Sequence, residues 1–180
     1  MKNFMERYSY ECVHLFLNQV AIGLFGLTLA LAAGKAQNEA LRIFTSVFAV
    51  MFFLVLQFMT MWKVGAQDRL SYDLSKLKRS YAVPVWMWLL SNSVNLLFAI
   101  LISLAVWFES PVLSAIGGVV VPITHVIGGM YTGILAINVG GVPLNSLWFM
   151  YFIVTLPALG VDFAAYVLGF NNVTLKGKKQ

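Results

Sequence analysis

Long runs without a single charged side chain dominate this sequence. No Asp, Glu, Lys or Arg occurs between Cys12 and Gly34, and a second such run extends from Ile43 to Trp62. Roughly 20 consecutive apolar residues are enough for a helix to cross the hydrocarbon core of a bilayer. Only 11% of the 180 residues are charged and 60% are hydrophobic, whereas a soluble domain carries about 25% charged residues. The chain is therefore predicted to be an integral membrane protein.

Five apolar segments divide the chain, and they predict an all-α fold, a polytopic transmembrane helical bundle of about five spans. We expect residues 1–180 to form a single integral membrane domain. The first segment is expected to be a retained span, because it is longer than the roughly 7–15 apolar residues of a cleaved signal sequence. The predicted spans are 11–33, 42–62, 81–108, 111–137 and 146–170.

The last two spans are rich in residues that interrupt helices. The fourth contains Pro122 and several glycines, and the fifth contains Pro157 and Gly160. Proline removes one helical hydrogen bond and clashes with the preceding turn, so a kink is expected in the fifth span. Between the two spans, Gly140 and Gly141 predict a turn. We expect both spans to be broken, and one of the two is a candidate for a re-entrant segment.

The basic residues give conflicting indications of how the chain is oriented in the membrane. The linker 63–80 holds the densest group of basic residues, so the positive-inside rule places it in the cytoplasm, together with the N-terminus. Five full crossings then put the C-terminus outside, although its lysines favour the inside. Either the tail departs from a statistical rule or one broken segment enters and leaves from the same side. The residues concerned are Lys63, Arg69, Lys76, Lys78 and Arg79 in the linker, and Lys176, Lys178 and Lys179 in the tail.

Several classes of function find no support in the sequence. The net charge of +5 comes from residues that flank the spans, which is typical of contact with anionic lipid head groups and not with nucleic acid. One cysteine and two histidines leave little for metal ligation, and no nucleotide-binding loop, H-E-x-x-H or C-x-x-C occurs. No nucleophile–base pair stands out. We expect no enzyme activity, no metal and no cofactor.

A few polar side chains fall inside the apolar segments. His125 and Asp162 are ionisable, and Asn92 and Asn95 share one helix face because they are three residues apart. Such groups usually face the interior of the bundle and have partners, because burying a carboxylate costs several kcal/mol. They predict either a polar intramembrane site for a proton, cation or small solute, or hydrogen bonds between helices. Further amides in the spans are Asn18, Gln19 and Gln57.

Small residues recur at a spacing that lets helices approach closely. Gly26, Ala30 and Gly34 follow one another at intervals of four, and Gly129 and Gly133 form a G-x-x-x-G. Both patterns favour close helix packing. The glycines of the fourth span have a second interpretation, a broken helix whose exposed backbone groups bind an ion or a substrate.

Two short motifs lie near the ends of the second and fifth spans. The first is W-x-x-G-A-x-D-R, with Trp62, Gly65, Asp68 and Arg69 at its fixed positions, and the second is P…A-Y-x-L-G-[FY], which begins at Pro157. In this order the motifs resemble those of a group of small uncharacterised polytopic membrane proteins of low-GC Gram-positive bacteria. The resemblance implies a bacterial plasma membrane and no particular activity. Asp68 and Arg69 would then anchor the basic linker or dock a partner.

Two functions are compatible with these features. The first is a membrane module that binds or transports a solute through a polar intramembrane site formed by Asn92, Asn95, His125 and Asp162. The alternative is a non-catalytic scaffold or regulatory subunit, which would leave a small-residue face open toward other membrane subunits or toward a second copy in a homo-oligomer. In both cases the lipid bilayer is a partner, and the sequence does not specify the solute.

Overall fold

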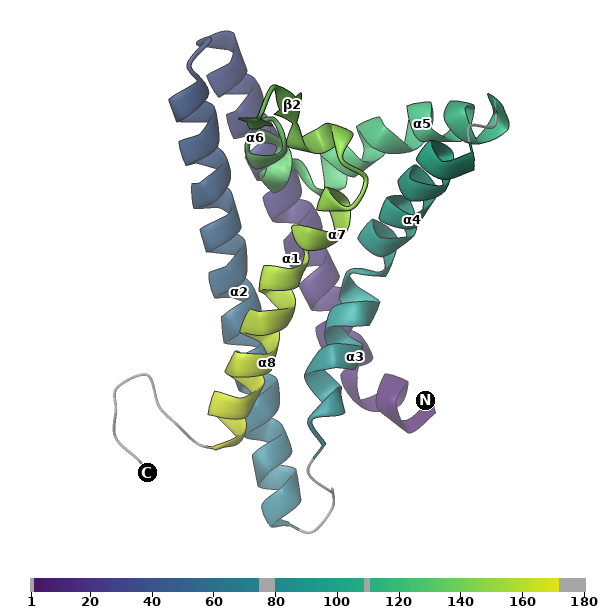
Figure 1. The fold of residues 1–180 in the computed structure, drawn as a ribbon. Helices are drawn as coiled ribbons and strands as arrows, with labels where there is room; N and C mark the ends of the chain where they lie inside the picture. The colour runs from purple at the N-terminus through teal and green to yellow at the C-terminus, as the bar shows by residue number, and fades with distance from the viewer. Residues whose placement is uncertain (1, 75–79, 109–110, 172–180) are drawn as a thin grey trace. The chain divides into compact units, whose positions relative to one another are not determined.

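The computed structural model describes residues 2–74, 80–108 and 111–171, and most of these are helical (Figure 1). The all-α prediction is confirmed. The lysines of the tail, and Lys76, Lys78 and Arg79 of the linker, lie outside the described residues. The α-helices are α1 (Lys2–Lys35), α2 (Glu39–Asp73), α3 (Ala82–Ser91), α4 (Ser93–Phe108), α5 (Pro111–Ile127), α6 (Thr132–Leu135), α7 (Met150–Ile153) and α8 (Leu156–Phe170). The shorter elements are the 3-10 helices η1 (Gly129–Tyr131) and η2 (Leu144–Ser146) and the strands β1 (Asn138–Val139) and β2 (Val142–Pro143).

The described residues include three helical segments that are long and apolar enough to cross a membrane. These are α1, α2 and the segment Met150–Phe170, and the number rises to five if α3 with α4, and α5 with α6, each count as one broken span. By length and composition the chain is a multi-pass membrane protein.

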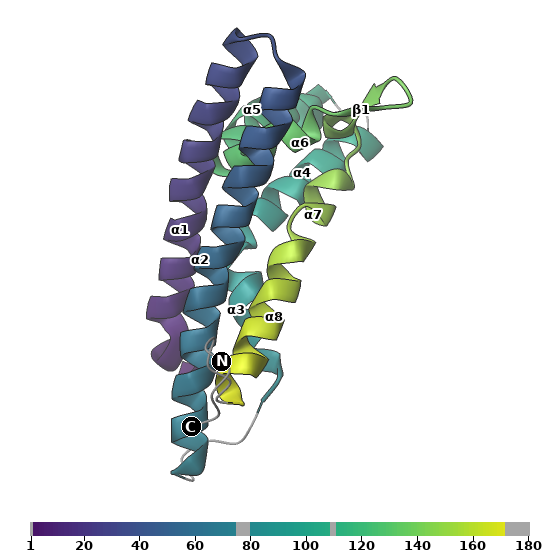
Figure 2. The same ribbon diagram turned by 90° about the vertical axis from the view of Figure 1, so that its left-hand side faces the viewer.

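The first two spans form a helical hairpin, α1 and α2 (Figure 2). At the turn Gln37 adopts a left-handed conformation with φ 51°. Asn38 caps α2, because its Oδ1 accepts a hydrogen bond from the Leu41 amide at 3.0 Å. No proline interrupts the end of the second span, and α2 continues to Asp73, through the first part of the predicted linker.

The third span is interrupted, which the sequence analysis did not predict. Residues 81–108 were expected as one span, yet α3 ends at Ser91 and α4 begins at Ser93. Neither glycine nor proline marks this break. Serine and asparagine side chains compete with the helix for backbone hydrogen bonds, and the Ser91 hydroxyl donates to the Trp88 carbonyl at 3.1 Å. Asn92 then starts α4, because its carbonyl accepts from the Leu96 amide at 2.9 Å.

The fourth and fifth spans are broken, as predicted. In the fourth, the helix continues through Pro122, and the two halves Gly117–Ile127 and Gly129–Leu135 meet at Gly128 with a bend of 87°. In the fifth, α7 ends at Ile153 and α8 starts at Leu156. Pro157 has no amide hydrogen to give to Ile153, so α7 cannot continue. Gly160 lies inside α8 and does not interrupt it.

A short β-hairpin connects the two broken spans. Val139 pairs with Val142, and between them Gly140 and Gly141 have φ values of 62° and 86°. Two successive left-handed residues form the turn that matches the twist of a two-stranded hairpin, and glycine adopts this conformation without a steric cost. The turn predicted from these two glycines is confirmed.

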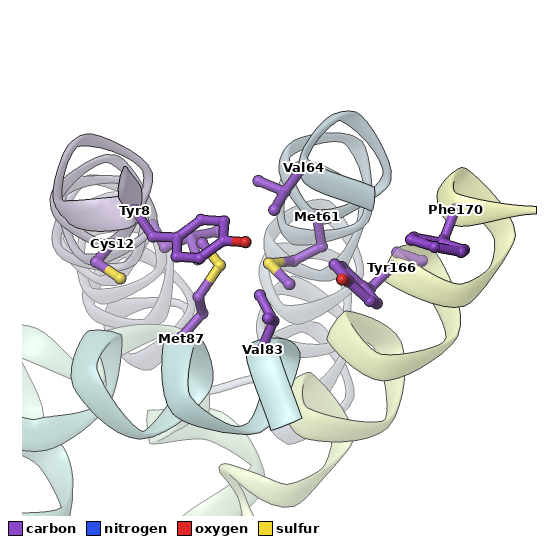
Figure 3. Packing of buried hydrophobic residues seen from close by; sticks show 10 residues of the cluster. Tyr8, Cys12, Met61, Val64, Val83, Met87, Tyr166 and Phe170 are labelled. Carbon is purple, nitrogen blue, oxygen red and sulfur yellow. The ribbon is translucent and has the colours of Figure 1, made fainter. Parts of the chain in front are cut away.

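The chain packs as two compact units, which we describe separately. Unit 1 consists of Met1–Phe16, Leu54–Ser91 and Leu156–Gln180, and unit 2 of Leu17–Phe53 and Asn92–Thr155. In unit 1, side chains from α1, α2, α3 and α8 form an apolar core (Figure 3). In unit 2, α4 packs against α5 and α7. The unit 1 core is Tyr8, Cys12, Leu15, Met61, Val64, Val83, Met87, Ala165, Tyr166 and Phe170.

Candidate functional site

The break in the fourth span packs tightly against α1 in unit 2. A Cβ atom at Gly129 would overlap the carbonyl oxygen of Gly23, and a Cβ at Gly26 would overlap the backbone of Met130. Gly23 itself leaves no room for a side chain beside the Ile127 carbonyl. Only glycines permit this approach, so the turn after α5 is held directly on the middle of the predicted first span.

From this turn the chain returns toward the α1–α2 turn. The Gly133 amide donates to the Ser46 hydroxyl at 2.8 Å, and a Cβ at Gly133 would overlap the carbonyl oxygen of Arg42, near the start of α2. Gly23 lies twelve residues before Lys35, which is about 18 Å along the helix axis at 1.5 Å per residue. The segment from Gly129 to Gly133 therefore rises from mid-span toward the end of the hairpin.

In unit 2, the end of α4 and the residue that precedes Phe149 lie next to each other. Trp107, at the end of α4, and Trp148, just before α7, have ring centroids 5.1 Å apart in an edge-on arrangement. Between these two tryptophans the described chain forms α5, η1, α6, the β-hairpin and η2. By length and bend, Gly117–Ile127 together with Gly129–Leu135 is either one broken span or a re-entrant segment.

A small, largely apolar cavity with several polar side chains in its wall lies beside the bend. The centre of a water molecule can occupy ≈ 20 Å³ of it, which is room for about one water. A site for a drug-sized ligand has roughly 300–1,000 Å³, so the cavity suits a species of a few atoms. Its polar lining comes from α4, α5, η1, α7 and the break before α8, and consists of Asn95, Thr124, His125, Tyr131, Tyr151 and Thr155.

Two groups of the lining are suited to hold such a species. The His125 Nδ1 lies 2.8 Å from the carbonyl oxygen of Val121. A carbonyl oxygen only accepts, so Nδ1 carries the hydrogen and Nε2 remains the basic nitrogen. Asn95 is 7% exposed, and its buried Oδ1 has no hydrogen-bond partner among the described residues. Each group offers a lone pair in a largely apolar environment.

The other predicted polar residues lie elsewhere. Asn92 does not line the cavity, and its Oδ1 accepts from the Gln19 side chain at 3.2 Å, which ties the start of α4 to α1. Asp162 belongs to α8 in unit 1, whereas His125 and both asparagines belong to unit 2. Of the four predicted site residues, the structure brings Asn95 and His125 together in one cavity.

Asp162 is a buried acid in unit 1. It is 0% exposed, and neither carboxylate oxygen has a hydrogen-bond partner within the described residues. Gln57 of α2 is also 0% exposed, and its amide atoms are unpartnered in the same part of the chain. A buried carboxylate costs several kcal/mol unless a proton or a cation neutralises it.

Gln57 and Asp162 lie at a similar depth. The helices α2 and α8 pack closely, because a Cβ at Gly65 would overlap the Tyr166 carbonyl and one at Gly169 would overlap the Trp62 carbonyl. The two helices run in the same direction (Figure 1). Gln57 is eight residues before Gly65 and Asp162 is seven before Gly169, or about 12 and about 10.5 Å along the two axes.

A second polar cluster surrounds Asp68 at one end of unit 1. Its Oδ1 accepts from Arg7 at 2.9 Å, and its Oδ2 accepts from the hydroxyls of Tyr8 at 2.7 Å and Tyr166 at 2.9 Å. Charge-assisted hydrogen bonds of this kind are among the stronger ones in proteins. Figure 3 shows Tyr8 reaching from α1 and Tyr166 from α8 into the space around α2. The arrangement ties three helices together.

The two sequence motifs meet at this cluster. Gly65 of the first motif packs on Tyr166 of the second, and Gly169 of the second packs on Trp62 of the first. Arg69 binds the Asp73 carboxylate at 2.8 Å and donates to the Phe170 carbonyl at 3.4 Å. The sequence identifies the first motif but not the residues that contact it. The tyrosine of the second motif, Tyr166, was the one signal in the sequence that could have indicated a partner for Asp68.

The small residues of α1 divide into two kinds. The backbone of Met130 occupies the space beside Gly26, and Ala30 is buried, whereas Gly34 has open space around it.

Within the described residues, no group of three or more His, Cys, Asp or Glu side chains is placed to hold a metal ion. Comparisons of the chain with models of protein families, with curated proteins and with solved structures find no match.

Proposed function

We propose that this chain is a transport-related membrane module that binds and passes a proton or a small monovalent cation. The observation that carries the proposal is the cavity at the bend of α5, with His125 and Asn95 in its wall. Irregular backbone occurs at membrane depth only where protein covers it or where it lines a water-filled space. Broken helices that meet a polar site near mid-membrane are the usual architecture of ion and solute pathways.

The proposal includes a membrane layout with four crossings. Arg7 and Tyr166 both donate hydrogen bonds to Asp68 in unit 1, which supports placing the start of α1, the end of α2 and the end of α8 on one side of the membrane. Under this proposal the number of crossings is even. If α5 and α6 are re-entrant from the other side, the N-terminus and the end of α8 would both lie in the cytoplasm, which agrees with the positive-inside rule for the basic residues next to them in the sequence.

The chemistry of the cavity fits a proton or a small cation. Nε2 of His125 can accept a proton, because the Val121 carbonyl already accepts the hydrogen that Nδ1 carries. The Asn95 oxygen can complete the coordination of hydronium or of a monovalent cation. Asp162 with Gln57 provides a second polar position in unit 1.

The scaffold alternative receives less support. It required a small-residue face left open toward a partner, whereas Gly26, Gly129 and Gly133 are covered by other parts of unit 2. Gly34 alone of the predicted packing residues is open. The resemblance of the two motifs remains the reason to place the protein in a bacterial plasma membrane.

Flux through proteoliposomes tests the proposal. The full chain is reconstituted with a pH-sensitive dye inside, a potassium diffusion potential is imposed, and proton uptake is recorded, with a sodium-sensitive dye in a parallel arm. We expect one of the two ions to enter faster than into protein-free vesicles, and His125→Phe, which fills the cavity, to abolish that difference. His14→Asn replaces the other of the two histidines and should leave the flux intact. Equal flux with and without protein in both arms refutes the proposal.

A further inference from the structure

One face of α8 is buried in unit 1, and Asp162 is the acid on it. The buried residues recur at intervals of three or four, which places them on a single side of the helix. This face packs against α2 and α3, and the Asp162 side chain is fully buried. The residues of the face are Ala158, Asp162, Ala165, Tyr166, Gly169 and Phe170.

The packing around Asp162 leaves no room for a counter-ion. Both carboxylate oxygens are buried and lack a hydrogen-bond partner within the described residues. Small residues on the same face, Ala158, Ala165 and Gly169, let the neighbouring helices approach closely. A metal cation or a hydronium ion would have to displace a helix to reach the carboxyl group, whereas a bound proton occupies no volume.

No charged side chain compensates Asp162 either. It takes part in none of the ion pairs among the described residues, and α3 contains no ionisable side chain. Gln57, at the same depth in α2, is neutral, and the nearest ionisable residues of that helix are Lys63 and Asp68, about 9 and about 16.5 Å farther along its axis. The other ionisable side chains of the unit 1 core, or stacked on α8, are phenols and a thiol that are neutral near pH 7: Tyr8, Cys12, Tyr81 and Tyr166.

We propose that Asp162 is a proton-binding site, and that the packing of α8 on α2 and α3 depends on the bound proton. Burying an ionised carboxylate without a partner costs far more than burying the neutral acid. Ionisation of Asp162 therefore requires α8 to separate from its neighbours until water reaches the carboxyl group. The site belongs to unit 1, whereas the cavity beside His125 belongs to unit 2, so Asp162 holds its proton whether or not an ion passes through that cavity.

NMR of ¹³C-labelled carboxyl groups in the full chain, embedded in lipid nanodiscs, tests the proposal directly. The sequence contains three aspartates, Asp68, Asp73 and Asp162, so a label on the aspartate carboxyl carbon gives three signals, whose chemical shifts distinguish acid from carboxylate. An aspartate in water has a pKa of about 3.9 and is ionised at about pH 6. At this pH we expect one protonated signal, absent from Asp162→Asn and retained in Asp73→Asn. Three ionised signals, or a protonated signal that survives in Asp162→Asn, overturn the proposal.

The pH dependence of stability tests the link to helix packing. In the unfolded chain Asp162 ionises above about pH 4, whereas the folded chain keeps the proton, so unfolding releases one proton and stability falls as the pH rises. Relative to Asp162→Asn, which is neutral at every pH, the folded-to-unfolded ratio of the wild type should fall about tenfold per pH unit between about pH 5 and about pH 7.

Asp73→Asn is the matched control for this measurement. It removes a half-exposed carboxylate from α2 in the same unit, and it should keep the slope of the wild type. Equal slopes in the wild type and Asp162→Asn overturn the proposal. Neither experiment measures flux, so their outcomes are independent of the ion transport proposed above.

Discussion

The hydroxyl of Tyr166 in α8 donates a hydrogen bond to Asp68 Oδ2 in α2 over 2.9 Å, although the two residues are 98 positions apart. Tyr8 donates to the same oxygen from α1. Asp68 is 3% exposed, so these bonds are shielded from water and fix the ends of three helices in unit 1. The contact also unites the two motifs of the sequence into one structural element.

Tyr166→Phe should lower the stability of unit 1 measurably. The substitution keeps the ring and removes one donor from a buried carboxylate, and the free energy of unfolding should fall by about 1–2 kcal/mol. Denaturation in mixed micelles, followed by circular dichroism, measures the change. Tyr72→Phe is the matched control, because the Tyr72 side chain is half-exposed and does not bind Asp68. Equal effects of the two variants would contradict the assignment of the hydrogen bond.

Gly169→Ala should destabilise the protein, although alanine favours helices. The added methyl group overlaps the Trp62 carbonyl, and overpacking of this kind costs about 1–3 kcal/mol. Gly160→Ala in the same helix meets nothing within 4 Å and should raise the stability by about 0.5–1 kcal/mol. Opposite signs for the two substitutions in the same unfolding experiment are the expected result. A Gly169→Ala variant as stable as Gly160→Ala would show that the motifs do not pack as described.

Gly26→Ala and Gly34→Ala separate two residues that the sequence pattern treats alike. A methyl group at Gly26 overlaps the Met130 backbone and should displace the turn after α5, whereas Gly34 is surrounded by open space. We expect Gly26→Ala to reduce both thermal stability and the ion flux of proteoliposomes by more than half, and Gly34→Ala to leave both within error. A loss in Gly34→Ala instead would indicate that this open position contacts a partner, as the scaffold alternative requires.

Cysteine accessibility distinguishes four crossings from five. In a Cys12→Ala background, single cysteines replace Gln37, Gly140 or Asn171, and intact cells are treated with a membrane-impermeant maleimide. Four crossings with a re-entrant segment predict labelling at Gln37→Cys and Gly140→Cys from outside, and labelling at Asn171→Cys only after permeabilisation. Five crossings predict the reverse for the last two positions. Gln37→Cys serves as the positive control, because both layouts place it outside.

The sequence predicted those elements whose cause is local. Apolar runs indicated the spans, Pro157 indicated the break before α8, and the paired glycines indicated the turn between β1 and β2, because each signal acts within a few residues. The break at Asn92 was missed because serine and asparagine interrupt a helix only when their side chains find the right partners, and Gln19 lies 73 positions away. Periodicity contains no information on such partners.

The same distinction between local and long-range causes applies to the candidate site. The sequence identified His125, Asn95 and Asp162 as polar groups in an apolar environment, which is a property of each residue. It could not pair them, because pairing depends on the 87° bend at Gly128 and on the return of the chain to α4. The partners of Asp68 were equally hidden, since Arg7 and Tyr166 are 61 and 98 positions from it.

The contact between Trp107 and Trp148 has a consequence for how this chain tolerates change. The residues between the two tryptophans form a closed excursion that begins and ends at one point, so its length does not set the register of the helices on either side. Changes of length at the exposed hairpin turn, Gly140 and Gly141, should therefore be accommodated far more readily than equal changes within α1 or α2, whereas Gly129 and Gly133 are fixed by their contacts with α1 and α2. Variation in length among homologous chains should concentrate at this turn.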